Sequence, residues 1–344
     1  MDYSLFIALW ALVAPEPAAT GSVGPFGPVL EDQPAAVVGA ELEPDPDDVA
    51  APPVNDLALG GTLAARYDRS FGRDATLPDE AGTTLSDAIV ALRGTWYGYR
   101  FEVALEFDET NGSTLDRMFV ESDLDQRHRL RVGLIRNPFL YSSFADEDGF
   151  VFPYRTRLGR EFMSTDEGLE FLADYGRADL RLSFTNGNDG VADSRRGTLR
   201  AGFHVLGERI HPGERPRPER EGLSFFLAYT DDGSFVSGDA FAIETHAQAG
   251  RFRFHGEWVD AADGIGDQRG LAGTLSAAFD GGATELAVRA ETLKAPQRRQ
   301  VFGVAATHSL MRDVLRVQGA IEHVSGPGTL DEGFTVSAGL VISL

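Results

Sequence analysis

Residues 99–108 read YRFEVALEFD, and this stretch decides the fold class. Large apolar side chains occupy every second position, and charged or small side chains lie between them. Because successive side chains of a β-strand point to opposite faces, the pattern predicts a strand with one apolar and one polar face. The same alternation recurs at 180–184 (LRLSF), 252–258 (FRFHGEW) and 286–290 (LAVRA), and it also ends the chain.

Sixteen segments with this pattern follow one another from residue 57 onward. Their predicted ranges are 57–68, 84–96, 98–108, 114–123, 128–136, 167–175, 177–186, 196–206, 221–231, 239–249, 251–260, 268–280, 283–293, 299–310, 313–324 and 333–344. Connections after odd-numbered segments are mostly long and polar, whereas those after even-numbered segments are mostly tight, apart from the long stretch 208–221. This asymmetry predicts an up-and-down antiparallel sheet with both termini on the short-turn side.

The length of the segments favours a membrane-spanning barrel over a soluble β-sandwich. Segments of about ten residues suit a tilted bilayer crossing better than the usual five or six residues of a soluble strand. Aromatic residues such as Trp96, Tyr97 and Tyr175 cluster at segment ends, where interfacial girdles lie. Since every backbone polar group within hydrocarbon must pair internally, the sequence predicts an all-β, closed, sixteen-stranded transmembrane antiparallel barrel over 57–344.

The first 56 residues differ in character from the predicted barrel, with ten acidic residues and no basic one. The longest apolar run, Leu5 to Ala14, has ten residues, which is shorter than the roughly 20 of a membrane-spanning helix. Small residues follow it, so we predict a signal peptide over 1–20, although no basic residue precedes the run; the alternative is a disordered apolar start. Residues 21–56 are rich in proline, alanine and acid, which predicts a disordered linker.

The composition excludes several classes of function. The chain of 344 residues has 31 basic and 53 acidic residues, a net charge of −22 and no cysteine. Absence of cysteine excludes a disulfide scaffold, a thiol nucleophile and a cysteine-ligated metal. The acidity argues against a nucleic-acid partner, which needs clustered Lys and Arg.

Catalytic motifs are also missing from the sequence. It contains no His-Glu-x-x-His, no Gly-x-Ser-x-Gly and no phosphate-binding glycine loop, so we expect no enzyme, cofactor or metal site. A barrel-embedded hydrolase would need a Ser/His pair that the sequence alone does not single out. Four of the seven scattered histidines could face the lumen. A lone histidine on the lumenal wall more often has a structural role than the role of a metal ligand. These are His128, His204, His246 and His255.

Short motifs resemble a known family. Residues 130–139, LRVGLIRNPF, resemble a segment of the phosphate-selective porin O/P family that ends the fifth strand and opens the third loop. The stretches 184–187 (FTNG), 255–258 (HGEW) and 284–290 (TELAVRA) are similar to further parts of that family. The resemblance covers 57–344 and implies a homotrimeric outer-membrane channel whose third loop folds inward to constrict the pore. Because Lys294 is the one lysine, the lysine-assisted phosphate selectivity of the family does not carry over.

The last eight residues, Ser337 to Leu344, resemble the C-terminal signal of bacterial outer-membrane proteins. The signal has a polar residue, a glycine two positions later and spaced hydrophobic residues, although the family prefers Phe where this chain has Leu344. The resemblance implies recognition by the outer-membrane assembly machinery. It also implies an integral protein of the bacterial outer membrane with both termini in the periplasm.

Two groups of charged residues are candidate pore residues. In the predicted third loop, Arg155, Arg157 and Arg160 follow an aromatic stretch, and the acidic residues 146–148 precede it. Groups of opposite sign on opposite sides of a constriction would create a transverse field. The acidic residues are Asp146, Glu147 and Asp148; they could also bind a hard divalent cation, although solvated loop charge is the commoner role.

Alternation of the strands predicts a second group on the pore wall. Its members are Arg100, Arg129, Arg131, Arg181, Arg200, Arg253, Arg289, Glu102, Glu106 and Glu257. They form either an arginine track for anions or a mutually paired structural network. The sequence thus predicts a porin for passive diffusion of small hydrophilic solutes or ions, with anion preference through lumenal arginines. The alternative is a non-conducting barrel that anchors the outer membrane to the cell wall through 21–56.

Overall fold

The computed structural model describes residues 57–72, 80–108, 112–146, 149–187, 195–210, 219–231, 237–263, 266–294, 298–311, 314–326 and 333–343, and the structural statements below concern these residues. The predicted signal peptide (1–20) and linker (21–56) lie outside them. So do Glu147, Asp148 and the terminal Leu344.

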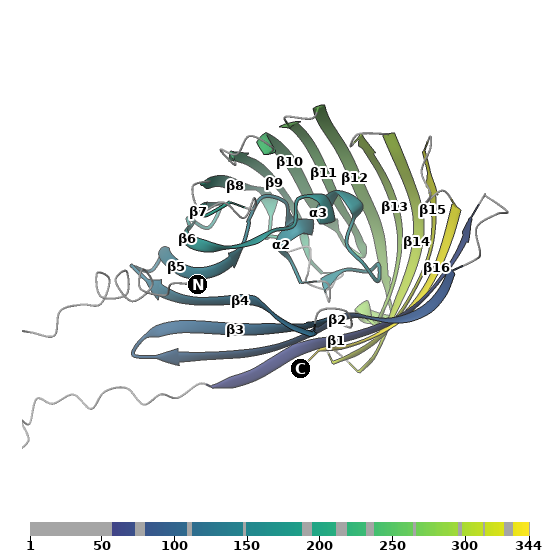
Figure 1. Ribbon diagram of the computed structural model, residues 1–344, viewed down its shortest axis with the longest axis horizontal. Helices are drawn as coiled ribbons and strands as arrows, with labels where there is room; N and C mark the ends of the chain where they lie inside the picture. Colours follow the sequence, from purple (N-terminus) through teal and green to yellow (C-terminus); the bar gives the residue numbers. More distant parts are fainter. Residues whose placement is uncertain are drawn as a thin grey trace, which may run out of the picture. The chain divides into compact units, whose positions relative to one another are not determined.

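Sixteen strands of the described residues form one closed barrel in which every neighbouring pair is antiparallel, so the predicted fold class is confirmed (Figure 1). The first strand closes the barrel by pairing with the last, with Tyr67 opposite Ala338. The strands are β1 (Ala58–Gly72), β2 (Glu80–Trp96), β3 (Tyr99–Asp108), β4 (Gly112–Asp123), β5 (His128–Arg136), β6 (Thr165–Asp174), β7 (Ala178–Thr185), β8 (Arg196–Gly207), β9 (Glu221–Asp231), β10 (Ser237–Ala249), β11 (Phe252–Asp263), β12 (Gly266–Phe279), β13 (Thr284–Lys294), β14 (Arg298–Met311), β15 (Leu315–Ser325) and β16 (Gly333–Ser343).

The tight connections lie where the sequence predicted them. Tyr97 and Gly98 form the turn between β2 and β3, and both have positive φ (50° and 82°). Positive φ at both central residues matches the twist of a two-residue hairpin. The largest differences in strand bounds occur on the opposite side of the barrel, where β1 continues to Gly72 and β2 begins at Glu80. There the backbone hydrogen bonds between β1 and β2 continue beyond the residues whose side chains alternate, so the predicted ranges were too short.

The two faces of the barrel differ as the alternation predicts. In β13, Leu286 and Val288 are exposed on the outer face, whereas Glu285, Arg289 and Glu291 are buried on the inner face. Most other strands likewise carry exposed large apolar side chains on the outer face. The protein therefore has an apolar exterior and a charged interior, the reverse of a soluble β-protein.

The connection between β5 and β6, residues 137–164, folds into the barrel and is called loop 3 below (Figure 1). It contains two short helices, α2 (Tyr141–Phe144) and α3 (Arg157–Glu161). Among the described residues, no helix is long and apolar enough to cross a membrane. The inward fold agrees with the prediction of a third loop that enters the lumen.

Small residues on the inner wall make room for loop 3. Leu158 packs with the wall residues Ala242 and Val259, and Phe152 packs on Ala305 in a second cluster. A Cβ added at Gly270 would lie 2.3 Å from the end of the Leu158 side chain, so a larger residue there would displace Leu158. Apolar burial of the loop against this wall stabilises its inward position.

Candidate pore constriction and lumenal charges

Wall carboxylates hold the backbone of loop 3. The Tyr141 N–H donates to Glu244 at 3.2 Å, and the Ser142 N–H and hydroxyl donate to Glu257 at 2.9 and 2.6 Å. The Arg157 N–H donates to Glu291 at 2.8 Å. These carboxylates satisfy backbone donors that the helices α2 and α3 leave open at their N-termini. Glu257, a predicted pore-lining residue, is consequently buried beneath the loop, with 1% of its surface exposed.

Wall donors hold the carbonyl groups of the same loop. Thr307 donates to the Val151 carbonyl and Gln318 to the Phe150 carbonyl, both at 2.8 Å. The Arg289 guanidinium donates to the Tyr154 carbonyl at 3.0 Å. Loop 3 is therefore fastened along the inner surface of β10 to β15. We call the inner surface of β8 to β15 the covered wall.

Arg155, expected at the constriction, has a structural role. It is buried, and its Nη1 donates to the carbonyl oxygens of Ser142, Ser143 and Ala145 at 3.0, 3.3 and 2.6 Å. These carbonyls lie in or just after α2, where a four-residue helix leaves acceptors open. The guanidinium thus fixes the shape of loop 3.

Two other residues expected at the constriction, Arg160 and Asp146, have contacts of their own. Arg160 lies over the ring of Tyr154, with 5.9 Å between the guanidinium carbon and the ring centroid. Asp146 pairs with two other arginines, Arg117 at 2.7 Å and Arg136 at 2.8 Å. Asp146 is thus held by arginines of β4 and β5, and the transverse field expected across the constriction stays a prediction.

Burial alone would raise the pKa of Asp146, but the guanidinium groups of Arg117 and Arg136 outweigh it and lower the pKa below its usual value. Sequence reasoning missed these two arginines. Arg117 follows the same alternation as Glu121 and could have been found, whereas Arg136 lies at the end of β5, where alternation gives way to the loop. A register shift opposite Leu105 marks a bulge that also buries Asp116, 2.9 Å from Arg136.

Four predicted pore-lining arginines lie on the inner surface of β3 to β7, which we call the open wall. Glu121 accepts ion pairs from Arg100, Arg129 and Arg131 at 3.0, 3.2 and 2.8 Å. Arg100 also pairs with Asp123 at the end of β4. Arg131 reaches Glu170 at 2.8 Å.

The fourth, Arg181, lies 3.7 Å from Glu170 and over the ring of Phe144 in loop 3.

Exposure differs between the partners of these pairs. Side chains of the four arginines are 21–43% exposed, whereas those of Glu121 and Glu170 are 5% and 1% exposed. Glu102 on the same wall pairs with Arg93 and Arg117, and Glu106, farther along β3, is half-buried. Solvent in the lumen therefore meets guanidinium groups, with the central carboxylates beneath them.

The three remaining predicted arginines belong to the covered wall. Arg200 pairs with Glu244, Arg253 with Glu285 at 2.8 Å, and Arg289 with Glu291 at 3.0 Å. All three arginine side chains are 3–8% exposed. The predicted lining arginines thus fall into two groups, four partly exposed ones that share Glu121 and Glu170 on the open wall and three buried ion pairs on the covered wall.

Comparisons with known proteins agree with the architecture. No family model matches the chain, and no curated protein matches it. Among solved structures, an anion-selective porin from Comamonas acidovorans is similar with a TM-score of 0.62 and 13% identity, covering 84% of this chain and 99% of that chain. A mutant of Rh. blastica porin is similar with a TM-score of 0.59 and 16% identity, covering 84% of this chain and 100% of that one. These likenesses show the general sixteen-stranded porin fold and not the phosphate-selective porin O/P family.

Proposed function

We propose that this protein is a passive diffusion channel of the bacterial outer membrane that passes small hydrophilic solutes and prefers anions. The observation that carries the proposal is the track of Arg100, Arg129, Arg131 and Arg181 on the open wall. These guanidinium groups are exposed to the lumen while Glu121 and Glu170 lie beneath them.

Physical chemistry connects this arrangement to selectivity. Charged side chains that ring a narrow pore set its ion preference, because the wall limits screening by water. Arginine stays protonated at every physiological pH and offers several donors to an anion. Phe144 of loop 3 lies against Arg181, so the loop borders the arginine track and narrows the path along it. The similar Comamonas porin is itself described as anion-selective, which supports the same preference here.

The proposal includes the placement of the chain. Residues 1–20 act as a signal peptide, 21–56 form a periplasmic linker, and both termini lie in the periplasm. Residues 337–344 direct insertion by the outer-membrane assembly machinery, and the barrel associates as a homotrimer. The apolar outer face supports bilayer insertion, whereas the trimer rests on the family resemblance alone.

Planar-bilayer recording of the purified, folded protein tests the proposal. We expect discrete conductance steps and, in a salt gradient, a reversal potential with the sign of anion preference. A barrel that inserts without conducting would instead favour the anchor function. A conducting barrel with cation preference would contradict the role given to the arginine track.

A further inference from the structure

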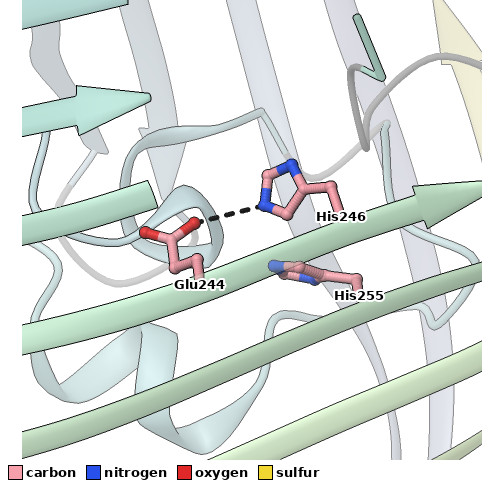
Figure 2. A group of neighbouring side chains, drawn as sticks. All are labelled: Glu244, His246 and His255. Atoms are coloured by element: carbon pink, nitrogen blue, oxygen red, sulfur yellow. Dashed lines mark hydrogen bonds and ion pairs between the residues drawn. The ribbon is translucent and has the colours of Figure 1, made fainter. Parts of the chain in front are cut away.

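The hairpin of β10 and β11 brings four ionisable side chains together beneath loop 3. The two-residue turn at Gly250 and Arg251 sets a register in which His246 lies opposite His255 and Glu244 opposite Glu257. Figure 2 shows the Glu244 carboxylate beside the His246 ring, with His255 next to both. One ligand atom from each of Glu244, His246 and His255 can be chosen so that all lie within 4.8 Å of one another.

Hydrogen bonding among the described residues leaves ring nitrogens of this cluster unused. His246 Nε2 lies 3.2 Å from Glu244 Oε2, but His246 Nδ1 and His255 Nε2 are buried without a hydrogen-bond partner in the described part of the chain. Glu257 Oε1 is 3.3 Å from His255 Nε2 without the alignment of a hydrogen bond. Ring packing between the histidines, at 4.7 Å and 86°, accounts for their burial but not for these polar atoms.

The charge balance of the cluster favours a cation. Glu244 and Glu257 are each 1% exposed. Arg200 pairs with Glu244, whereas Glu257 receives the neutral donors of Ser142. One of the two buried carboxylates therefore has a guanidinium partner and the other does not, and an added cation would offset the remaining negative charge.

We propose that Glu244, His246 and His255 form a binding site for a borderline divalent transition-metal ion, with Zn²⁺ as its representative. Two imidazoles and one carboxylate are the donor set of three-ligand zinc sites, whereas Ca²⁺ and Mg²⁺ prefer oxygen ligands throughout. The ion binds the His246 Nε2 that now faces Glu244, and the ring proton moves to the unused His246 Nδ1, so the imidazole stays neutral. This site is independent of solute passage along the open wall.

The surroundings support a ligand carboxylate and leave room for water beside one imidazole. Arg200 Nη2 donates to Glu244 Oε2 at 2.9 Å and fixes the carboxylate, the role of an outer-shell partner at metal sites. His255 also lines a cavity of about 40 Å³, next to Ser142, Thr156 and Ser276. That volume holds a water molecule beside His255.

Loop 3 covers the site. The Tyr141 ring packs edge-on against His246 and His255, at 5.5 and 5.6 Å between centroids, and its N–H donates to Glu244. An ion bound here therefore joins the β10–β11 hairpin to the segment that narrows the pore. Exchange of the ion requires Tyr141 to move, so we expect its release to be slow.

Calorimetric titration of Zn²⁺ into the folded, chelator-treated full chain tests the site. We expect one Zn²⁺ per chain at high affinity, and with Co²⁺ a visible absorption band typical of four-coordinate nitrogen and oxygen ligation. His246→Ala and His255→Ala should each weaken Zn²⁺ binding more than about 100-fold, since even loss of an outer-shell partner costs about 10- to 100-fold.

His204→Gln is the matched control. It also removes a buried lumenal imidazole, but both His204 nitrogens are already bonded, to Ser224 and Asp179. The control should bind Zn²⁺ like the natural chain. All variants retain the acidic residues 1–56, so any weak Zn²⁺ binding by that segment is the same in every variant. If the alanine variants fail to fold, His246→Gln and His255→Gln replace them.

Two results would overturn the site. One is a natural chain that binds Zn²⁺ no tighter than about 1 mM. The other is a folded histidine variant with unchanged affinity. Neither result bears on conductance or ion selectivity, which are measured separately.

Discussion

The open and covered walls of the barrel are built from the same alternating pattern but have different chemistry. The predicted lining arginines of the open wall, Arg100, Arg129, Arg131 and Arg181, have side chains 21–43% exposed, whereas Arg200, Arg253 and Arg289 on the covered wall are 3–8% exposed. The difference comes from loop 3, which packs on alanine and glycine residues of the covered wall. Identical residue types thus fasten a loop on one side and contact lumenal solvent on the other.

Energetics should follow the same division. A buried ion pair that loses one partner leaves an uncompensated charge, which costs far more than the loss of an exposed pair. The covered wall therefore contributes stability, and the open wall is free to determine which ions pass. Four predictions test this separation.

The largest effect is expected at Arg289. Arg289→Ala leaves Glu291 and Glu322 buried without their guanidinium partner, and we expect it to destabilise the barrel by about 3–5 kcal/mol. Arg129→Ala on the open wall should cost at most about 1 kcal/mol. Denaturant unfolding of the refolded barrel in lipid vesicles measures both. Equal costs would show that loop 3 does not divide the walls energetically.

The outer face should not distinguish the two walls. Val288→Arg lies on the outer face behind the covered wall, and Leu182→Arg lies on the outer face behind the open wall. Each should lower the free energy of unfolding by about 2–4 kcal/mol if near the bilayer midplane. Val288→Leu is the matched control and should be nearly neutral. The same unfolding assay applies. A cost for either arginine variant no greater than that of Val288→Leu would contradict the strand register.

Much of this architecture could be predicted because alternation reports which face a residue occupies. The predicted range 221–231 coincides with β9, and Leu286 and Arg289 lie on the faces assigned to them. Prediction was poorer where the backbone continues its ladder without alternating side chains, as at the end of β1. It also could not find the bulge at Asp116, which depends on pairing with β3.

The site was harder to predict because it depends on contacts between distant segments. Arg155 bonds to carbonyls that are open only because α2 is short, and no charge pattern reveals that. Likewise, alternation places Arg131 and Arg253 equally on inner faces, and only the course of loop 3 separates them. The pairing of His246 with His255 was within reach, since a tight turn at Gly250 fixes it.

A smaller effect, on selectivity, is expected from the open wall. The double substitution Arg131→Ala and Arg181→Ala leaves Glu121 and Glu170 with fewer cations and opens them to the lumen. The reversal potential should shift toward cation preference at low salt. At 1 M salt, where the screening length is about 3 Å, the shift should nearly vanish. Arg269→Ala, on the outer face, is the control and should leave the reversal potential unchanged at both salt concentrations. An unchanged reversal potential in the double variant would show that the arginine track does not line the conduction path.

The smallest effect concerns the ion pairs that join Asp146 of loop 3 to Arg117 and Arg136 on the open wall. Its pKa is lowered in the folded protein, chiefly because Arg117 and Arg136 outweigh the effect of burial. An unfolded Asp titrates at about 3.9. The link therefore stabilises the loop above that pH, and its contribution is lost as the pH falls through the lower, folded pKa.

Current noise of the open channel should report this link, because a loosened loop changes the width of the pore. We expect noise to rise in the natural chain as the pH falls below about 3.9, and Asp146→Asn to show raised noise already at pH 7. Asp125→Asn is the control. Its pKa is also lowered, to about 2, by a hydrogen bond from His128, but it lies in the turn between β4 and β5 and should leave the noise unchanged. If Asp146→Asn were as quiet as the natural chain at pH 7, the packing of loop 3 on the covered wall would alone hold it, and the two walls would differ even more than their charges indicate.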